Sequence, residues 1–158
     1  MATQSGQPLL AACAAGRMTQ LSLEQGRSSL TPFAFISYAW VASWVCGDYP
    51  LARLFAAQGV QLANRYGGLN HPSGSDPDEA ALHAMILYAS RVQHWLAPLD
   101  EIRHHVEKLA LLARENQFPT VLQECTSRQI YYLEVTSTTL MKLVVTGLYD
   151  GKRTTRLL

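Results

Sequence analysis

The apolar residues of this chain recur at intervals of three and four over a long central stretch, residues 31–116. That spacing places their side chains on one face of an α-helix. The stretch falls into two similar halves. Each half has a first segment rich in aromatic and aliphatic residues, a tight break, and a longer second segment that opens near a proline. The pattern predicts two successive helical hairpins, at about residues 31–67 and 78–116.

The second helices of the two hairpins can be aligned with a constant shift of 47 residues. The aligned positions are Ala52, Phe55, Gly59, Leu62, Ala63 and Tyr66 in the first hairpin, and Leu99, Ile102, Val106, Leu109, Ala110 and Ala113 in the second. The prolines near the start of these helices, Pro50 and Pro98, match at a shift of 48, so that the turn absorbs one residue. The alignment predicts an internal repeat.

The first helix of each hairpin is predicted to be buried on more than one side, because its apolar positions cover much of its circumference. These positions are Ile36, Ala39, Trp40 and Ser43 in the first hairpin, and Leu82, Met85, Ile86, Ala89 and Leu96 in the second. A single hairpin cannot cover such a helix, whereas a stack of hairpins can. We therefore expect an all-α fold of stacked antiparallel helical hairpins, a tetratricopeptide-like α-solenoid fragment, as a single domain over residues 1–158.

Local signals predict where several helices begin and end. A preceding helix is expected at about residues 8–26, with Gly26 as its stop. Its core-facing positions are expected to be Leu10, Ala14, Met18 and Leu21. Ser28, Ser29 and Thr31 are candidate caps of the next helix, with Thr31 favoured because Pro32 follows it, and Asp48 is expected to cap the helix after that. The acidic residues within 75–79 predict a further helix start.

The C-terminal segment, residues 118–150, is rich in β-branched residues and its structure is ambiguous. In a helical reading, one face would hold Val121, Leu122, Cys125 and Leu133, and another Leu140, Leu143, Val144 and Leu148. Alternatively, the runs QIYYLEV and LMKLVV would form a β-hairpin. By analogy with the preceding hairpins, we favour the helical reading.

Composition narrows the choice of partners. Apolar residues make up 48% of the chain and charged residues 16%, which favours a piece whose open repeat ends are covered by more protein or self-associate. The net charge of +1 gives no reason to expect nucleic acid or an anionic membrane. No apolar run reaches the roughly 18 residues of a membrane span. The three scattered cysteines, Cys13, Cys46 and Cys125, are interpreted as reduced core cysteines of a cytoplasmic protein.

The chain has none of the common signatures for phosphate binding, zinc proteolysis or nucleophilic catalysis: GxxxxGK[ST], GxGxxG, HExxH and GxSxG are absent. The histidines do not suggest a metal site either. His104 and His105 would point about 100° apart on a helix, and His83 and His94 would lie roughly 16 Å apart along one. We interpret His94 and its neighbour Trp95 as a packed corner between helices. No catalytic, cofactor-binding or metal-binding residue is predicted.

Aromatic residues raise the one candidate for a site. Tyr38, Trp40, Trp44, Tyr88 and Trp95, with Tyr49 nearby, would line a groove for a partner or ligand if they gathered on one side of the helices. The plainer alternative is that each simply packs one helix against another, and for any single residue that alternative is favoured.

Three stretches carry a resemblance to a known family. MTQLSLEQGRSS, the hairpin AFISYAWVASWVCGDYPLARLFAAQGVQLANRYG, and QHWLAPLDEIRHHVEKLALLARENQ are similar to the helical-repeat region of large bacterial signalling proteins. In that family a serine/threonine kinase-like domain and an AAA/STAND-type ATPase precede a tetratricopeptide-like array, often followed by a sensor domain and a histidine kinase. The resemblance covers residues 18–117. No catalytic residue carries over, because the kinase and ATPase motifs are absent.

Two functional hypotheses follow. The first is a non-enzymatic interaction and regulatory module of a bacterial signal-transduction protein, which relays or scaffolds contacts between neighbouring domains or subunits. The alternative is a sensor domain that binds a small ligand in an apolar pocket between the hairpins.

Overall fold

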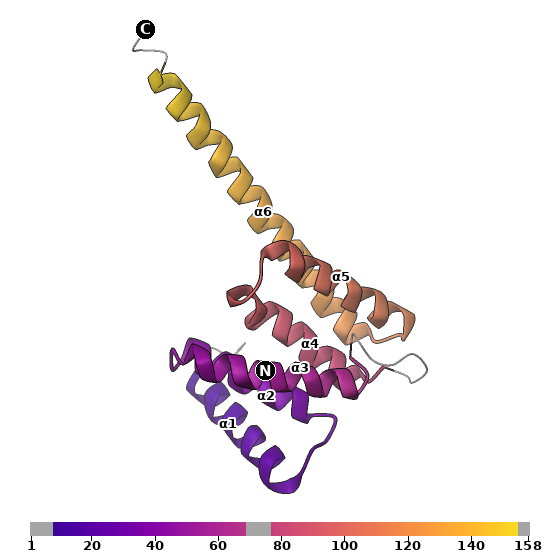
Figure 1. Ribbon diagram of the computed structural model, residues 1–158. Coiled ribbons are helices and arrows are strands. Elements are labelled where there is room, and N and C mark those ends of the chain that lie inside the picture. Colours follow the sequence, from indigo (N-terminus) through magenta and orange to yellow (C-terminus); the bar gives the residue numbers. More distant parts are fainter. Residues whose placement is uncertain (1–7, 69–76, 155–158) are drawn as a thin grey trace.

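The computed structural model describes the backbone of residues 8–68 and 77–154 and the side chains of residues 9–68 and 77–138. Every regular element in these ranges is helical, which confirms the all-α prediction (Figure 1). The elements are α1 (Pro8–Gln25), α2 (Thr31–Trp44), α3 (Tyr49–Arg65), α4 (Glu79–Arg91), the 3₁₀ turn η1 (Gln93–Trp95), α5 (Leu99–Glu115) and α6 (Pro119–Thr154).

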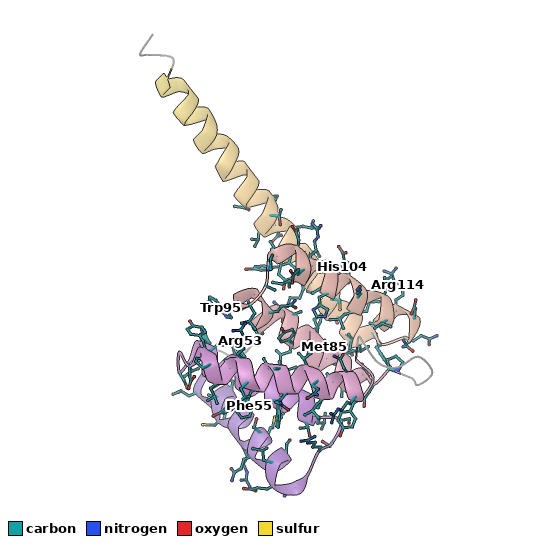
Figure 2. The ribbon with its side chains drawn as sticks, viewed as in Figure 1. Arg53, Phe55, Met85, Trp95, His104 and Arg114 are labelled. Atoms are coloured by element: carbon teal, nitrogen blue, oxygen red, sulfur yellow. The ribbon has the colours of Figure 1, made fainter. Side chains whose placement is uncertain are left out.

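Helices that follow one another in the chain pack as antiparallel pairs, and α4 lies at the centre of the fold (Figure 1). This helix contacts α2 and α3 on one side and α5 and α6 on the other. Its buried residues point in several directions around the axis: Ala81, Leu82, Ala84, Met85, Ile86 and Ala89. Met85, in the middle of α4, lies between the two hairpins (Figure 2). The expected burial of the first helix of the second hairpin is therefore observed, apart from its C-terminal end.

Buried positions recur between the two hairpins at an interval of 50 residues, so the predicted shift of 47 is wrong. Buried positions of α3 recur in α5 at that interval: Ala52 and Ile102, Ala56 and Val106, Gly59 and Leu109, Ala63 and Ala113. The first helices match in the same way at Phe35 and Met85, Ile36 and Ile86, and Ala39 and Ala89. The error arose because alanines hold six of these fourteen buried positions, and alanine carries little apolar weight in a sequence pattern.

Gly59 shows how the first hairpin differs from the second. A Cβ atom at this position would lie 2.6 Å from Cγ1 of Ile36 and 3.3 Å from its backbone nitrogen. The equivalent position in α5 is Leu109, which is fully buried. Helices α2 and α3 are thus close together at Gly59 because one of them has no side chain there.

The helix starts follow local signals with one exception. The Leu51 N–H donates to Oδ1 of Asp48 at 3.0 Å, which confirms Asp48 as the cap of α3. Asp78 caps α4 by accepting from the Ala80 N–H at 2.7 Å, whereas residues 75 and 76 of the predicted start lie outside the described residues. Thr31 is not the cap of α2: it is the first helical residue, and its hydroxyl accepts from the Ser28 N–H at 2.8 Å.

The second helices end in the same way, although their sequences differ. After α3, Gly67 has φ of +104°, and the Gly68 N–H donates to the carbonyl of Ala63. After α5, Gln117 takes the corresponding left-handed conformation with φ of 58°, and the Phe118 N–H donates to Ala113 at 2.9 Å. Both are Schellman-type ends, in which glycine is usual. The turn into α6 is therefore formed without a glycine.

Two predicted helix faces differ from the structure. In α1, which ends before Gly26 as expected, Leu10 and Ala14 are exposed, while Ala15 and Thr19 face α2. The Thr19 hydroxyl donates to the carbonyl of Ala34 at 3.1 Å, so a buried polar contact selects this face. In the second hairpin, α4 ends at Arg91, and Leu96, which we expected on its apolar face, is exposed beyond it.

The C-terminal segment is helical, as favoured over the β-hairpin. Helix α6 is 36 residues long; its first half packs on α4 and α5, and its second half extends away from the other helices (Figure 1). Val121 and Cys125 are buried as expected, but Leu133 is 61% exposed, because the neighbouring Tyr132 takes the core-facing position on this turn of the helix. The side chains of residues 140–148 lie outside the described residues.

Candidate binding cleft

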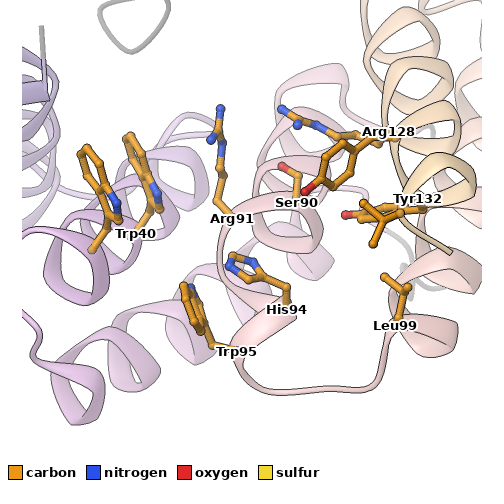
Figure 3. A pocket seen from close by; sticks show the side chains of 11 residues that line it. Trp40, Ser90, Arg91, His94, Trp95, Leu99, Arg128 and Tyr132 are labelled. Atoms are coloured by element: carbon orange, nitrogen blue, oxygen red, sulfur yellow. The ribbon is translucent and has the colours of Figure 1, made fainter. Parts of the chain in front are cut away.

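An open cleft of about 850 Å³ lies where the ends of several helices converge (Figure 3). One wall comes from the C-terminal half of α2, the floor from the end of α4 and from η1, and the other wall from α6 and the start of α5. The lining residues are Trp40, Trp44, Ser90, Arg91, His94, Trp95, Leu99, Arg128, Tyr131, Tyr132 and Val135.

Three of the five predicted groove residues meet in this cleft, namely Trp40, Trp44 and Trp95. The indole rings of Trp40 and Trp44 are stacked, with centroids 5.5 Å apart and an interplanar angle of 7°. Their positions are one helical turn apart in α2, which explains the stacking. Because the chain has three tryptophans, all of its indole rings line this one cleft.

The other predicted residues lie elsewhere. Tyr38 packs edge-on against Phe55 of α3, with ring centroids 4.7 Å apart. Tyr88 is partly buried between α4 and α5, where its ring meets that of His105 at 6.4 Å. Tyr49 reaches the outer side of Trp95, with ring centroids 6.3 Å apart. Tyr38 and Tyr88 therefore follow the alternative in which an aromatic residue joins one helix to another.

The interpretation of His94 and Trp95 as a packed corner is wrong. Trp95 is 55% exposed, and the two rings contact each other, with centroids 4.4 Å apart. The buried polar residue of this corner is the neighbouring Gln93, whose Oε1 lies 2.9 Å from Nδ1 of His105. That contact holds η1 against α5, and it turns the two residues that follow Gln93 outward. Burial lowers the pKa of His94 below its usual value, so the ring is neutral at pH 7.

Sequence reasoning missed the two arginines of the cleft. Arg91 is the last residue of α4, and its guanidinium carbon lies 5.3 Å from the ring centroid of Trp40. Arg128 lies on α6, and the two side chains extend toward the same side of the cleft (Figure 3). The two residues are far apart in the chain and belong to no motif. A useful signal would have been the early end of α4, which brings its last residue to the cleft.

An ion pair lies on α4 and α6 near this region. Nδ1 of His83 and a carboxylate oxygen of Glu124 are 3.6 Å apart. The contact with Glu124 raises the pKa of His83, and the same contact lowers the pKa of Glu124. The pair therefore favours its charged form. Glu124, the acidic residue of α6 that is nearest in sequence to Arg128, thus has His83 as its ion-pair partner.

The described residues contain no other constellation that suggests chemistry. Within them, no three His, Cys, Asp or Glu side chains come together in a way that would hold a metal ion. Of the cysteines, which we had placed in the core, only Cys125 is buried, while Cys13 and Cys46 are exposed. The residues that the structure describes include no helix with the length and apolar character needed to cross a membrane.

Comparison with known proteins adds no assignment: no family model matches the chain, and no match was found among curated proteins or solved structures. The cleft is thus the feature on which a function can be argued.

Proposed function

We propose that this chain is a non-enzymatic helical-repeat module of a bacterial signal-transduction protein, located in the cytoplasm, which scaffolds or relays contacts between neighbouring domains or subunits. The 50-residue recurrence of buried positions supports a tetratricopeptide-like array. The resemblance of residues 18–117 to the repeat region of ATPase-fused kinases supports the signalling context.

The observation that carries the proposal is the exposed apolar surface of α6. Ile130, Tyr131 and Leu133 are each more than half exposed, although Tyr132 on the same turns of the helix is buried. Burying an aliphatic side chain is worth about 1.5–3 kcal/mol, so a surface of this kind favours association. A neighbouring domain or subunit that packs along α6 would cover these side chains.

Light scattering combined with size-exclusion chromatography, over a range of protein concentrations, tests the proposal. We expect self-association of the isolated chain as its concentration rises, and a marked loss of association in Leu133→Glu. Ser127→Glu, which adds the same charge at another exposed position of α6, is the matched control. A strictly monomeric chain would count against an exposed contact surface, and ATP hydrolysis by the pure chain would refute a non-enzymatic role.

The second candidate, a ligand-binding sensor, is favoured by one specific observation. All three tryptophans line a cleft whose volume of about 850 Å³ falls within the range of small-molecule sites. Most of its lining comes from α2, α4 and α6, with smaller parts from η1 and the start of α5. Tryptophan fluorescence that responds saturably to one class of small molecule would support this role, whereas no response to chemically diverse compounds would argue against it.

A further inference from the structure

The charged side chains that line the cleft are all cationic. The lining includes two guanidinium groups, from Arg91 and Arg128, and no carboxylate among the described residues. Ser90 lies beside Arg91 in the chain and adds a hydroxyl on the same helix end. One edge of the cleft is therefore cationic, while the remaining surface is mainly aromatic and aliphatic.

Neither arginine of the cleft forms a salt bridge within the part of the chain that the structure describes. No carboxylate in that part of the chain lies within salt-bridge distance of either guanidinium. Glu124, one helical turn before Arg128, is engaged with His83 at 3.6 Å. Burial and, secondly, the positive charge of Arg128 lower the pKa of Arg91, and the carboxylate of Glu124 offsets part of this lowering. An anion at this edge would relieve both effects, because it would bind the charged groups and offset their repulsion.

The aromatic wall beside this edge offers flat faces. Trp44 is 57% exposed and stacks on Trp40, and Trp40 in turn lies beneath the guanidinium of Arg91. On the floor, the rings of His94 and Trp95 contact each other, and Trp95 is also more than half exposed. Flat aromatic surfaces favour planar ligands through offset or edge-to-face contacts. Guanidinium groups select carboxylate, sulfonate or phosphate through paired hydrogen bonds.

We propose that the cleft binds a planar aromatic anion, with its acidic group at Arg91 and Arg128 and its ring system against Trp40, Trp44 and Trp95. This inference rests on the second candidate function, ligand binding in the cleft, and specifies the class of ligand. A neutral ligand in this cleft would leave the two guanidinium groups without an anionic partner.

Two fluorescent probes that share a ring system test the inference on the full chain. One is 8-anilinonaphthalene-1-sulfonate, an aryl anion, and the other is N-phenyl-1-naphthylamine, which lacks the sulfonate. We expect the anion to bind more tightly, with energy transfer from tryptophan. Arg91→Gln and Arg128→Gln should each weaken binding of the anion by about tenfold or more, since each removes a charge-assisted hydrogen bond to the sulfonate. Both variants should bind the neutral probe within about twofold of the wild-type chain, which also shows that the cleft is still folded.

Arg27→Gln is the matched control, because Arg27 lines a second hollow of about 440 Å³ that is formed mainly by α1 and α3 and contains Phe35 and Phe55. This variant should leave binding of the anion unchanged. If it weakens binding and the two cleft variants do not, the anion occupies the other hollow and the inference is overturned. If both probes bind equally in all variants, the cleft binds ligands without selecting anions, and the second candidate function survives. If neither probe binds, the inference and the second candidate function are both refuted.

Discussion

The close approach of α2 and α3 at Gly59 makes a prediction that opposes ordinary helix propensity. Replacing a glycine in a helix by alanine stabilises the helix by about 1 kcal/mol when the new methyl group has room. Gly16 of α1 provides that case, since nothing lies within 4 Å of a Cβ atom built there. At Gly59 the same methyl group would lie 2.6 Å from Cγ1 of Ile36, a residue that is fully buried.

The magnitude follows from these distances. Two carbon atoms pack best at about 3.5–4.0 Å, so the helices must separate locally by about 1 Å to admit the methyl group. Overpacking of this kind costs about 1–3 kcal/mol. We place Gly59 in the upper part of that range, because the Ile36 backbone nitrogen also lies within 3.3 Å and cannot rotate away. After the gain from helix propensity, Gly59→Ala should lower the free energy of unfolding by about 1–2 kcal/mol, whereas Gly16→Ala should raise it.

Urea denaturation followed by far-UV circular dichroism measures both variants against the wild-type chain. The double variant with Ile36→Ala provides the sharper test, because this substitution removes the Cγ1 and Cδ1 atoms that a Cβ at Gly59 would meet. Ile36→Ala alone should cost about 2–5 kcal/mol. In that background Gly59→Ala should become neutral or stabilising. Equal stabilisation by alanine at both glycines of the otherwise wild-type chain would refute the close approach of α2 and α3.

Further predictions concern the ion pair, a turn and a thiol. The His83–Glu124 pair should stabilise the fold most between about pH 4.5 and 6.5: the raised pKa of His83 adds stability that is lost at higher pH, and the lowered pKa of Glu124 adds stability that is lost at lower pH. Glu124→Gln should therefore lower the free energy of unfolding most within that pH window, by less than about 1 kcal/mol. A loss that does not change with pH would contradict the ion pair between His83 and Glu124. Gln117→Gly should raise the urea midpoint, with a gain of about 1 kcal/mol, because it relieves a left-handed backbone, and an unchanged midpoint would contradict that strain. Cys125 should resist alkylation in the folded chain, since burial raises the pKa of its thiol to about 12. The exposed Cys13 and Cys46 should react, and mass spectrometry identifies which of the three cysteines is alkylated.

The cleft shows how far sequence reasoning reached toward the candidate site. Trp40 and Trp44 could be paired from their spacing, because residues one helical turn apart meet on the same face. Trp95 joined them only because α4 ends at Arg91 and η1 turns the chain outward. Arg128 lies on α6, a segment that the sequence alone left open between a helix and a β-hairpin. A site assembled from the ends of α2, α4 and α5, the turn η1 and an interior stretch of α6 leaves no contiguous pattern to recognise.

The sequence by itself determined the features that depend on neighbouring residues: the helical hairpins with their tight breaks, the cap at Asp48 and the helix stop at Gly26. These are set within one or two turns, where hydrogen bonds and side-chain spacing act locally. Only the tertiary structure decided the 50-residue register, the face that α1 buries and the point at which α6 leaves the core. The register depends on small residues such as Ala56 and Gly59, whose importance lies in how closely another helix approaches them and not in their own hydrophobicity. The buried face of α1 depends on the contact between Thr19 and the carbonyl of Ala34 in another helix.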